Sequence, residues 1–269
     1  MNQQGWMHGL RLGGRNLWRD LRAGELRLLM ISVSLAVAAL TAVGFLADRM
    51  QTGLWRDARQ LLGGDAVVVS DQNTPPNLVQ QARQMGLQTN TNITFPTMAR
   101  AMSEQGGASR LVALKAVEPG YPLRGQLQVV PQPTAASIPP SGQVWVDPAL
   151  LDNLNLQAGQ MLGLGDRSFR ITATIEREPD RGAGFMTFAP RVMINAADLP
   201  STGLVQPASR VTWRMAVAGD TAAAERFVQW AKPEVEQSHV RGVQIESLDS
   251  GRPEMRQTLD RAAQFLNLV

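Results

Sequence analysis

The longest apolar stretch of the chain runs from Leu28 to Ala47 and contains 20 residues without a charged side chain. Arg27 and Asp48 flank it. A helix rises about 1.5 Å per residue, so this stretch spans roughly 30 Å, the thickness of a bilayer's hydrocarbon core. A cleaved signal peptide is the alternative, but its apolar core is usually only about 7–15 residues long and follows a short basic segment. The pattern therefore predicts an uncleaved transmembrane helix over 28–47.

Two flanking segments also have helical periodicity. In 5–24, one side of a helix collects apolar residues and the other collects arginines, which is typical of a helix lying among lipid headgroups; four glycines leave a flexible tail as the alternative. We assign 1–27 to a cytoplasmic amphipathic basic segment. After the membrane run, 48–64 is predicted to continue outward as a stalk helix that ends at Gly63-Gly64.

The rest of the chain alternates short strands and helices, which predicts a membrane-anchored α+β protein with a mixed α/β exported domain in two lobes. Proline and serine are concentrated in 131–142, the predicted boundary between a first lobe, 65–130, and a second lobe, 143–252. Thr74 is predicted to cap a helix that begins at Pro75. Strands are expected at 65–70, 88–97, 109–117, 143–146, 188–194, 210–217 and 243–246, helices at 75–85, 147–154 and 221–231, and a hairpin over 159–176.

From Pro253 the helical pattern returns, and it becomes apolar towards Val269. We interpret 253–269 as a return stalk followed by the truncated start of a second transmembrane helix. An ordinary C-terminal helix is the alternative.

The positive charge of the chain is confined to its first part. The whole chain has 26 basic and 23 acidic residues, a net charge of +3; residues 1–27 hold five arginines and two acidic residues, also a net of +3. An arginine excess beside a transmembrane helix marks the cytoplasmic side, so the main domain is expected outside the cytoplasm. Nucleic-acid binding is not indicated.

The sequence contains little that could perform catalysis. It has no cysteine, which excludes thiol chemistry, and only two histidines, His8 and His239. Metal-ligand spacings, a nucleophile elbow and nucleotide-binding loops are all missing from the sequence. We therefore predict no catalytic, cofactor-binding or metal-binding residue, and a chain that is not an enzyme.

Three weaker features were weighed against simpler interpretations. Glu176, Glu178 and Asp180 alternate with Arg177 and Arg181, which favours a solvated loop. The run 181–185 is a candidate ligand-contact loop. Most of the 12 methionines are expected to fill the core, and Lys115 and Lys232, the two lysines, carry no functional prediction.

Several short motifs occur in an order that resembles the ABC-transporter permeases of the FtsX/LolC/MacB superfamily, and its YbbP branch in particular. The resemblance covers about residue 15 to the end. The motifs are LGGD at 62–65, KAVEPGYPLRG at 115–125, LNLQAGQML at 154–162, EPD at 178–180, APR at 189–191 and SRVTWR at 209–214.

This resemblance implies the N-terminal part of a permease subunit in the bacterial inner membrane, with a cytoplasmic N-terminus and a periplasmic core domain. In such mechanotransmission transporters a separate cytoplasmic ATPase, similar to YbbA or LolD, binds ATP and Mg²⁺, and this chain binds no cofactor. The implied work is the extraction or handover of hydrophobic molecules or lipids from the membrane, with a periplasmic TesA-like esterase as a further partner.

Two other functions fit the same pattern. A single-pass membrane protein with a periplasmic sensor or assembly-adaptor domain predicts that Val269 is the native C-terminus. A membrane-anchored hydrolase predicts an essential exported serine or aspartate, and the missing histidine and metal motifs weigh against it.

Overall fold

The computed structural model describes residues 25–132, 137–182, 188–206, 209–237 and 242–247. The chain divides into two compact units between Leu54 and Trp55, and each is described by itself. The amphipathic segment predicted before residue 25, the two histidines and the return stalk predicted over 253–269 lie outside the described residues.

The first helix, α2, runs from Glu25 to Leu62 and contains the predicted membrane span and stalk in one element. Among the described residues, one helical segment, Arg27–Leu62, is long and apolar enough to cross a membrane, and an 18-residue stretch within it has a mean hydropathy of 2.3. The helix ends where predicted, because Gly63 adopts a positive φ of 79° that side-chain-bearing residues rarely adopt.

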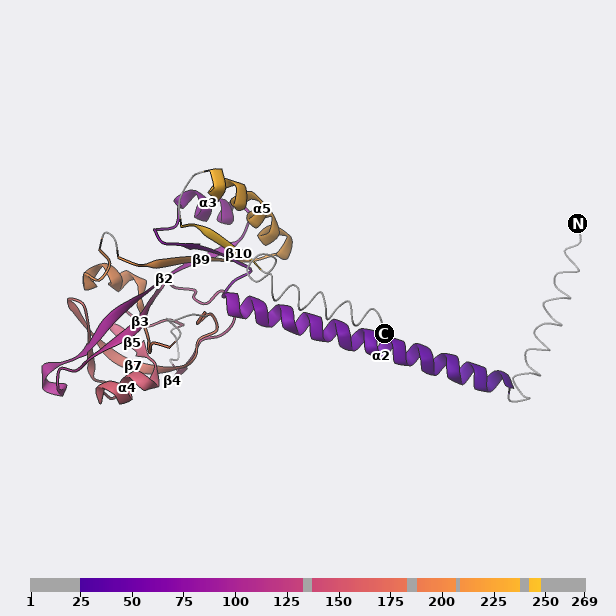
Figure 1. Ribbon diagram of the computed structural model, residues 1–269, viewed down its shortest axis with the longest axis horizontal. Helices are drawn as coiled ribbons and strands as arrows, with labels where there is room; N and C mark the ends of the chain where they lie inside the picture. Colours follow the sequence, from indigo (N-terminus) through magenta and orange to yellow (C-terminus); the bar gives the residue numbers. More distant parts are fainter. Residues whose placement is uncertain (1–24, 133–136, 183–187, 207–208, 238–241, 248–269) are drawn as a thin grey trace, which may run out of the picture. The chain divides into compact units, whose positions relative to one another are not determined.

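The second unit, which is predicted above to be exported and is called the exported unit from here on, is built around one mixed sheet of ten strands in the order β10-β1-β9-β2-β3-β8-β5-β7-β4, with β6 paired to β2 and β7 (Figure 1). Neighbouring strands are antiparallel except for the pairs β3–β8 and β5–β7, which are parallel. The strands are β1 (Ala66–Ser70), β2 (Gln88–Ala101), β3 (Ser109–Val117), β4 (Gln128–Val130), β5 (Gln143–Val146), β6 (Met161–Leu164), β7 (Arg167–Arg177), β8 (Arg191–Asn195), β9 (Thr212–Ala218) and β10 (Gln244–Ser247).

Helices and short 3-10 segments connect these strands. They are α3 (Pro76–Gln84), η1 (Ser103–Gln105), α4 (Pro148–Leu154), η3 (Ala196–Thr202) and α5 (Thr221–Gln237). The predicted cap of α3 is wrong by one residue. Pro75 is the N-cap and Pro76 begins the helix, while the Thr74 hydroxyl is buried without a hydrogen-bond partner. Proline suits the first helical position, and because Pro75 and Pro76 are consecutive, the sequence did not decide which of them begins the helix.

The hydrophobic core is divided, but not at the boundary predicted between two lobes. One core combines α3 and α5 with β1 and β9, so it joins the two ends of the exported sequence (Figure 1). A second core lies between α4 and the middle strands β2, β3, β5, β6, β7 and β8. The predicted boundary at 131–142 does not divide the sheet, because β1 pairs with β9 and β3 pairs with β8 across it. Strand pairing between distant segments overrides the local proline signal.

The two faces of the middle strands are buried differently. Leu114 and Ala116 of β3 lie in the core beneath α4, whereas the intervening Lys115 lies on the opposite face. There a third, smaller core contains Tyr121, Trp145 and Met193. This second face carries the polar cluster described next.

Candidate functional site: a buried ion cluster at the end of the stalk

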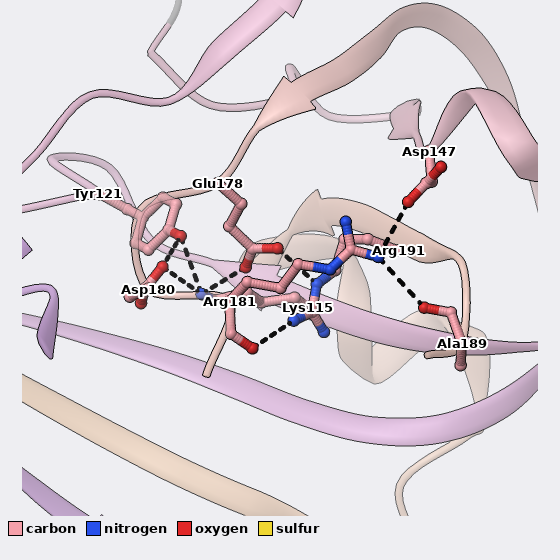
Figure 2. Close-up of polar contacts among 8 residues, drawn as sticks. All are labelled: Lys115, Tyr121, Asp147, Glu178, Asp180, Arg181, Ala189 and Arg191. Carbon is pink, nitrogen blue, oxygen red and sulfur yellow. Dashed lines mark hydrogen bonds and ion pairs between the residues drawn. The ribbon is translucent and has the colours of Figure 1, made fainter. Parts of the chain in front are cut away.

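Lys115 is the centre of a group of charged side chains inside the exported unit (Figure 2). Its side chain is only 2% exposed, although lysine is among the residues least often buried. The ammonium nitrogen lies 2.9 Å from Oε1 of Glu178, 2.8 Å from Oδ1 of Asp180 and 2.8 Å from the hydroxyl oxygen of Tyr121. Lysine has three N–H donors, and these three acceptors satisfy all of them.

Arg191, the first residue of β8, balances the charge of this group. Its Nε donates to Oε2 of Glu178 at 2.7 Å, and its Nη2 donates to the carbonyl oxygen of Arg181 at 3.3 Å. Glu178 therefore bridges the lysine and the arginine (Figure 2). We call Lys115, Tyr121, Glu178, Asp180 and Arg191 the ion cluster. Two cations and two carboxylates compensate one another, which is the condition for tolerating charges in an interior.

The ion cluster changes the proton affinity of two of its members. Burial raises the pKa of Tyr121 well above its usual value, and the negative charges of Asp180 and Glu178 raise it further. Burial also acts to raise the pKa of Asp180, but the charge and hydrogen bond of Lys115 and the hydrogen bond donated by the Tyr121 hydroxyl outweigh burial and leave that pKa below its usual value. At neutral pH the tyrosine is therefore a neutral donor and Asp180 a charged acceptor.

A second polar group surrounds Asp65, three residues beyond the end of α2. Arg124 donates from Nε at 3.1 Å and from Nη2 at 2.7 Å to its two carboxylate oxygens, and the backbone N–H of Gly219 donates at 2.9 Å. Arg59, in the last turn of α2, lies 3.7 Å from the same carboxylate. Burial acts to raise the pKa of Asp65, but these hydrogen bonds and positive charges prevail and lower it.

Two glycines bring α2 and the ion cluster into contact. A Cβ atom on Gly63 would lie 3.0 Å from Cβ of Asp180, which is tighter than nine in ten real contacts of a Cβ atom. A Cβ on Gly125 would lie 2.7 Å from Cβ of Pro179 and 3.5 Å from Cβ of Gln60. The backbone at the end of α2 therefore lies directly against the segment that carries Glu178 and Asp180. We call this contact region, residues 59–65 with Arg124, Gly125 and 178–180, the joint.

Four motifs that are far apart in the sequence meet at the joint and the adjoining ion cluster. They are the segments 62–65, 115–125, 178–180 and 189–191, and they contribute Asp65, Lys115, Tyr121, Arg124, Glu178, Asp180 and Arg191. The sequence analysis quoted these motifs for their resemblance to a family, without predicting that they converge. The structure shows that they build one packed connection.

The predicted solvated loop at 176–181 is partly wrong. Glu176 and Arg177 are exposed, but Glu178 and Asp180 are buried among the partners described above. The neighbouring Arg181 pairs with Asp147 at 2.9 Å. Alternating charges normally indicate a solvated surface, and only their distant partners, Lys115 and Arg191, change that outcome.

The ion cluster is closed to solvent, and nothing in its composition indicates catalysis. Among the described residues, no three histidine, cysteine, aspartate or glutamate side chains gather in a way that could hold a metal ion. Of the candidate ligand-contact loop at 181–185, residues 183–185 lie outside the described part. Of the methionines considered for an adaptable surface, Met193 and Met215 are fully buried, as predicted for core residues.

Comparison with known proteins relates the chain to a transporter subunit. It is 34% identical over 254 residues to the protein named "Uncharacterized ABC transporter permease YbbP" of Escherichia coli (strain K12). The alignment covers 94% of this chain and 30% of that relative, so the chain spans less than a third of the relative's length. No family model matches the sequence.

Two solved structures have a partly similar arrangement of elements. The periplasmic region of MacB from Actinobacillus actinomycetemcomitans is 12% identical, with a TM-score of 0.45, over 75% of this chain and 95% of that one. The extracellular domain of the transporter YknZ from Gram-positive bacteria is 8% identical, with a TM-score of 0.44, over 68% of this chain and 100% of that one.

Proposed function

The chain belongs to the YbbP-like family of ABC transporter permeases, and we propose that it is the part of a permease subunit that transmits movement from the membrane to a periplasmic domain. Permease subunits are not the catalytic subunits of these transporters, which agrees with the prediction that the chain is not an enzyme. In the proposed function a cytoplasmic ATPase binds ATP and Mg²⁺ and supplies the force. The cargo is a hydrophobic molecule or lipid of the inner membrane.

The joint is the observation that supports this proposal. The helix α2 continues beyond the apolar residues 28–47 to Leu62; its last turn places Arg59 3.7 Å from Asp65, and Gly63 packs against Asp180 of the ion cluster. Separating the buried carboxylates from Lys115, Arg191 and Arg124 would leave charges uncompensated in the interior, so the segment against which α2 ends holds a single geometry. A helix fixed in this way can move the sheet without sliding against it.

The direction of the chain through the membrane follows from its charge. All of the excess positive charge precedes the apolar segment, which supports a cytoplasmic N-terminus and a periplasmic sheet in the proposed arrangement. A periplasmic esterase of the TesA type is the proposed recipient of extracted molecules. Family resemblance alone supports that partner.

The test is to break the rigidity of the stalk without touching the joint. Two glycines inserted between Gly53 and Leu54 introduce flexible backbone that does not carry force. We expect the full-length permease, reconstituted with its ATPase, to continue hydrolysing ATP but to stop removing a fluorescent long-chain lipid analogue from proteoliposomes.

Gly53→Ala is the matched control, because a Cβ at this position would meet no atom within 4 Å and alanine favours the helix. We expect this variant to transport at least as well as the native chain. Full transport by the insertion variant would refute the mechanical role.

A further inference from the structure

The second face of the middle strands is covered at one end and open at the other. At the covered end, Trp145 and Met193 are buried with Tyr121. At the open end, Met98 of β2 is 50% exposed and its cross-strand neighbour Leu111 of β3 is 43% exposed. Residues opposite one another on antiparallel strands point to the same side, so these two apolar side chains lie side by side in solvent.

The register extends this open surface across β6 and β7. Arg100 is opposite Gly163, Gly163 is opposite Ser168, and Met161 is opposite Arg170. Met102 belongs to the same side, because its sulfur accepts a hydrogen bond from the Ser168 hydroxyl at 3.6 Å. We call this surface the methionine face; its defining residues are Met98, Arg100, Met102, Leu111, Met161 and Arg170.

The charge of the methionine face is entirely positive. None of its six defining residues is acidic, and within the described part of the chain no carboxylate pairs with the guanidinium group of Arg100 or Arg170. By contrast, Arg124 of the joint is paired with Asp65, and Arg191 of the ion cluster is paired with Glu178. The methionine face therefore presents two arginines without carboxylate partners beside exposed methionine and leucine side chains.

Its composition matches that of protein interfaces, in which methionine and arginine are enriched. Methionine side chains adapt to different apolar partners, and the arginine fork binds carboxylates with two parallel hydrogen bonds. A second copy of the same face would bring like charges together, which disfavours self-association. These features point to a partner with carboxylates on either side of an apolar stripe.

The spacing of the arginines indicates the form of that partner. Arg100 and Arg170 lie two strands apart and two residues along the sheet, so their backbones are about 12 Å apart at ordinary strand spacing. Two helical turns, about seven residues, cover roughly 10.5 Å. We propose that the methionine face docks an amphipathic helix of a protein partner, with acidic residues about two turns apart beside its apolar stripe. This proposal does not depend on the mechanical role of the joint.

Photo-crosslinking in the full-length permease tests the proposal. A permease variant that carries a benzophenone amino acid in place of Met98 is irradiated in native inner membranes. The matched control variant carries the same amino acid in place of Gln229, an exposed position of α5. We expect a discrete protein adduct from position 98, at a yield at least about fivefold above the control. Sequencing of the crosslinked peptide should show carboxylate residues flanking apolar ones.

Charge reversal supplies the second measurement. Arg100→Glu with Arg170→Glu should lower the adduct yield about tenfold by repelling an acidic partner, whereas Arg226→Glu on α5 should leave it unchanged. All three positions are exposed, and unchanged protease resistance verifies the fold. An adduct with lipid or with a second copy, a yield no higher than at Gln229, or an adduct insensitive to charge reversal would each overturn the proposal.

Discussion

Replacing Lys115 by methionine tests whether the ion cluster holds the exported unit together. Methionine keeps the length and the apolar stem of lysine but removes its charge and all three donors. The ammonium group now contacts Tyr121, Glu178 and Asp180 at 2.8–2.9 Å. In the variant, two buried carboxylates face a single remaining cation, Arg191.

The size of the effect follows from burial. Removing one partner of a buried ion pair costs about 3–5 kcal/mol, because the other charge stays in the interior without compensation. For a domain of this size, 1 kcal/mol shifts the unfolding midpoint by roughly 2–4 °C, so Lys115→Met should lower the midpoint by about 6–20 °C. Adding Asp180→Asn should restore part of this loss, because it removes the uncompensated negative charge. A surface lysine would show neither effect.

Thermal unfolding of the full-length chain in detergent, followed by tryptophan fluorescence, gives the midpoint. Lys232→Met is the matched control, since Lys232 is the other lysine of the sequence and lies exposed on α5. We expect the control to unfold within about 0.5 kcal/mol of the native chain. A Lys115→Met variant as stable as this control would show that the ion cluster does not stabilise the fold.

Three further predictions concern the joint and its surroundings. Tyr121 is the single tyrosine of the chain, so phenolate absorbance reports its ionisation alone. Because its pKa is raised, it should stay neutral well above pH 10 in the folded protein and ionise near pH 10 only in denaturant. Ionisation near pH 10 in the folded protein would contradict its burial. The lowered pKa of Asp65 stabilises the fold above about pH 4, and this stabilisation is lost as the pH falls through the pKa that Asp65 has in the folded protein. In urea unfolding, Asp65→Asn should therefore be less stable than the native chain at pH 7, and the difference in unfolding free energy should shrink at acid pH. An equal difference at both pH values would refute this linkage. Gly63→Ala should destabilise more than Gly86→Ala by about 1–3 kcal/mol in thermal unfolding, because both glycines have a φ of 79° but only the first would strike Asp180; equal losses would mean that the contact is not tight.

Local signals in the sequence were enough to predict most elements. Gly63 stops α2 and Asp147 caps α4, accepting a hydrogen bond from the backbone N–H of Ala149, as the residue types suggest. The hairpin at 161–177 was predicted from its turn at Gly165-Asp166. Each of these features depends on neighbours within a few residues. The order of the strands depends instead on contacts between distant segments, and for that reason the lobes were predicted with the wrong membership.

The ion cluster could not be predicted from local patterns, because each of its charges looks ordinary beside its own neighbours. Glu178 and Asp180 stand in an alternating charged run, and this pattern favours solvent. Lys115 gave the one usable signal. It interrupts an apolar strand, Leu111 to Val117, at a position where burial needs a compensating carboxylate. A search for that carboxylate would have led to the acidic residues at 178 and 180.

The convergence of the four motifs explains why such short and unspecific segments occur together in one chain. The position of Asp180 requires a residue without a side chain at 63, the charge of Asp180 requires Lys115, and the charge of Asp65 requires Arg124, so each motif supplies what another requires. An apolar joint could be equally stable, but apolar contacts can exchange partners at little cost when one element turns against another. Charges held by paired partners cannot be exchanged in this way without leaving one of them buried and alone. In the proposed function, ion pairs that cannot exchange partners keep the end of α2 packed in one arrangement against the segment 178–180, and transmission of force would require this property more than additional stability.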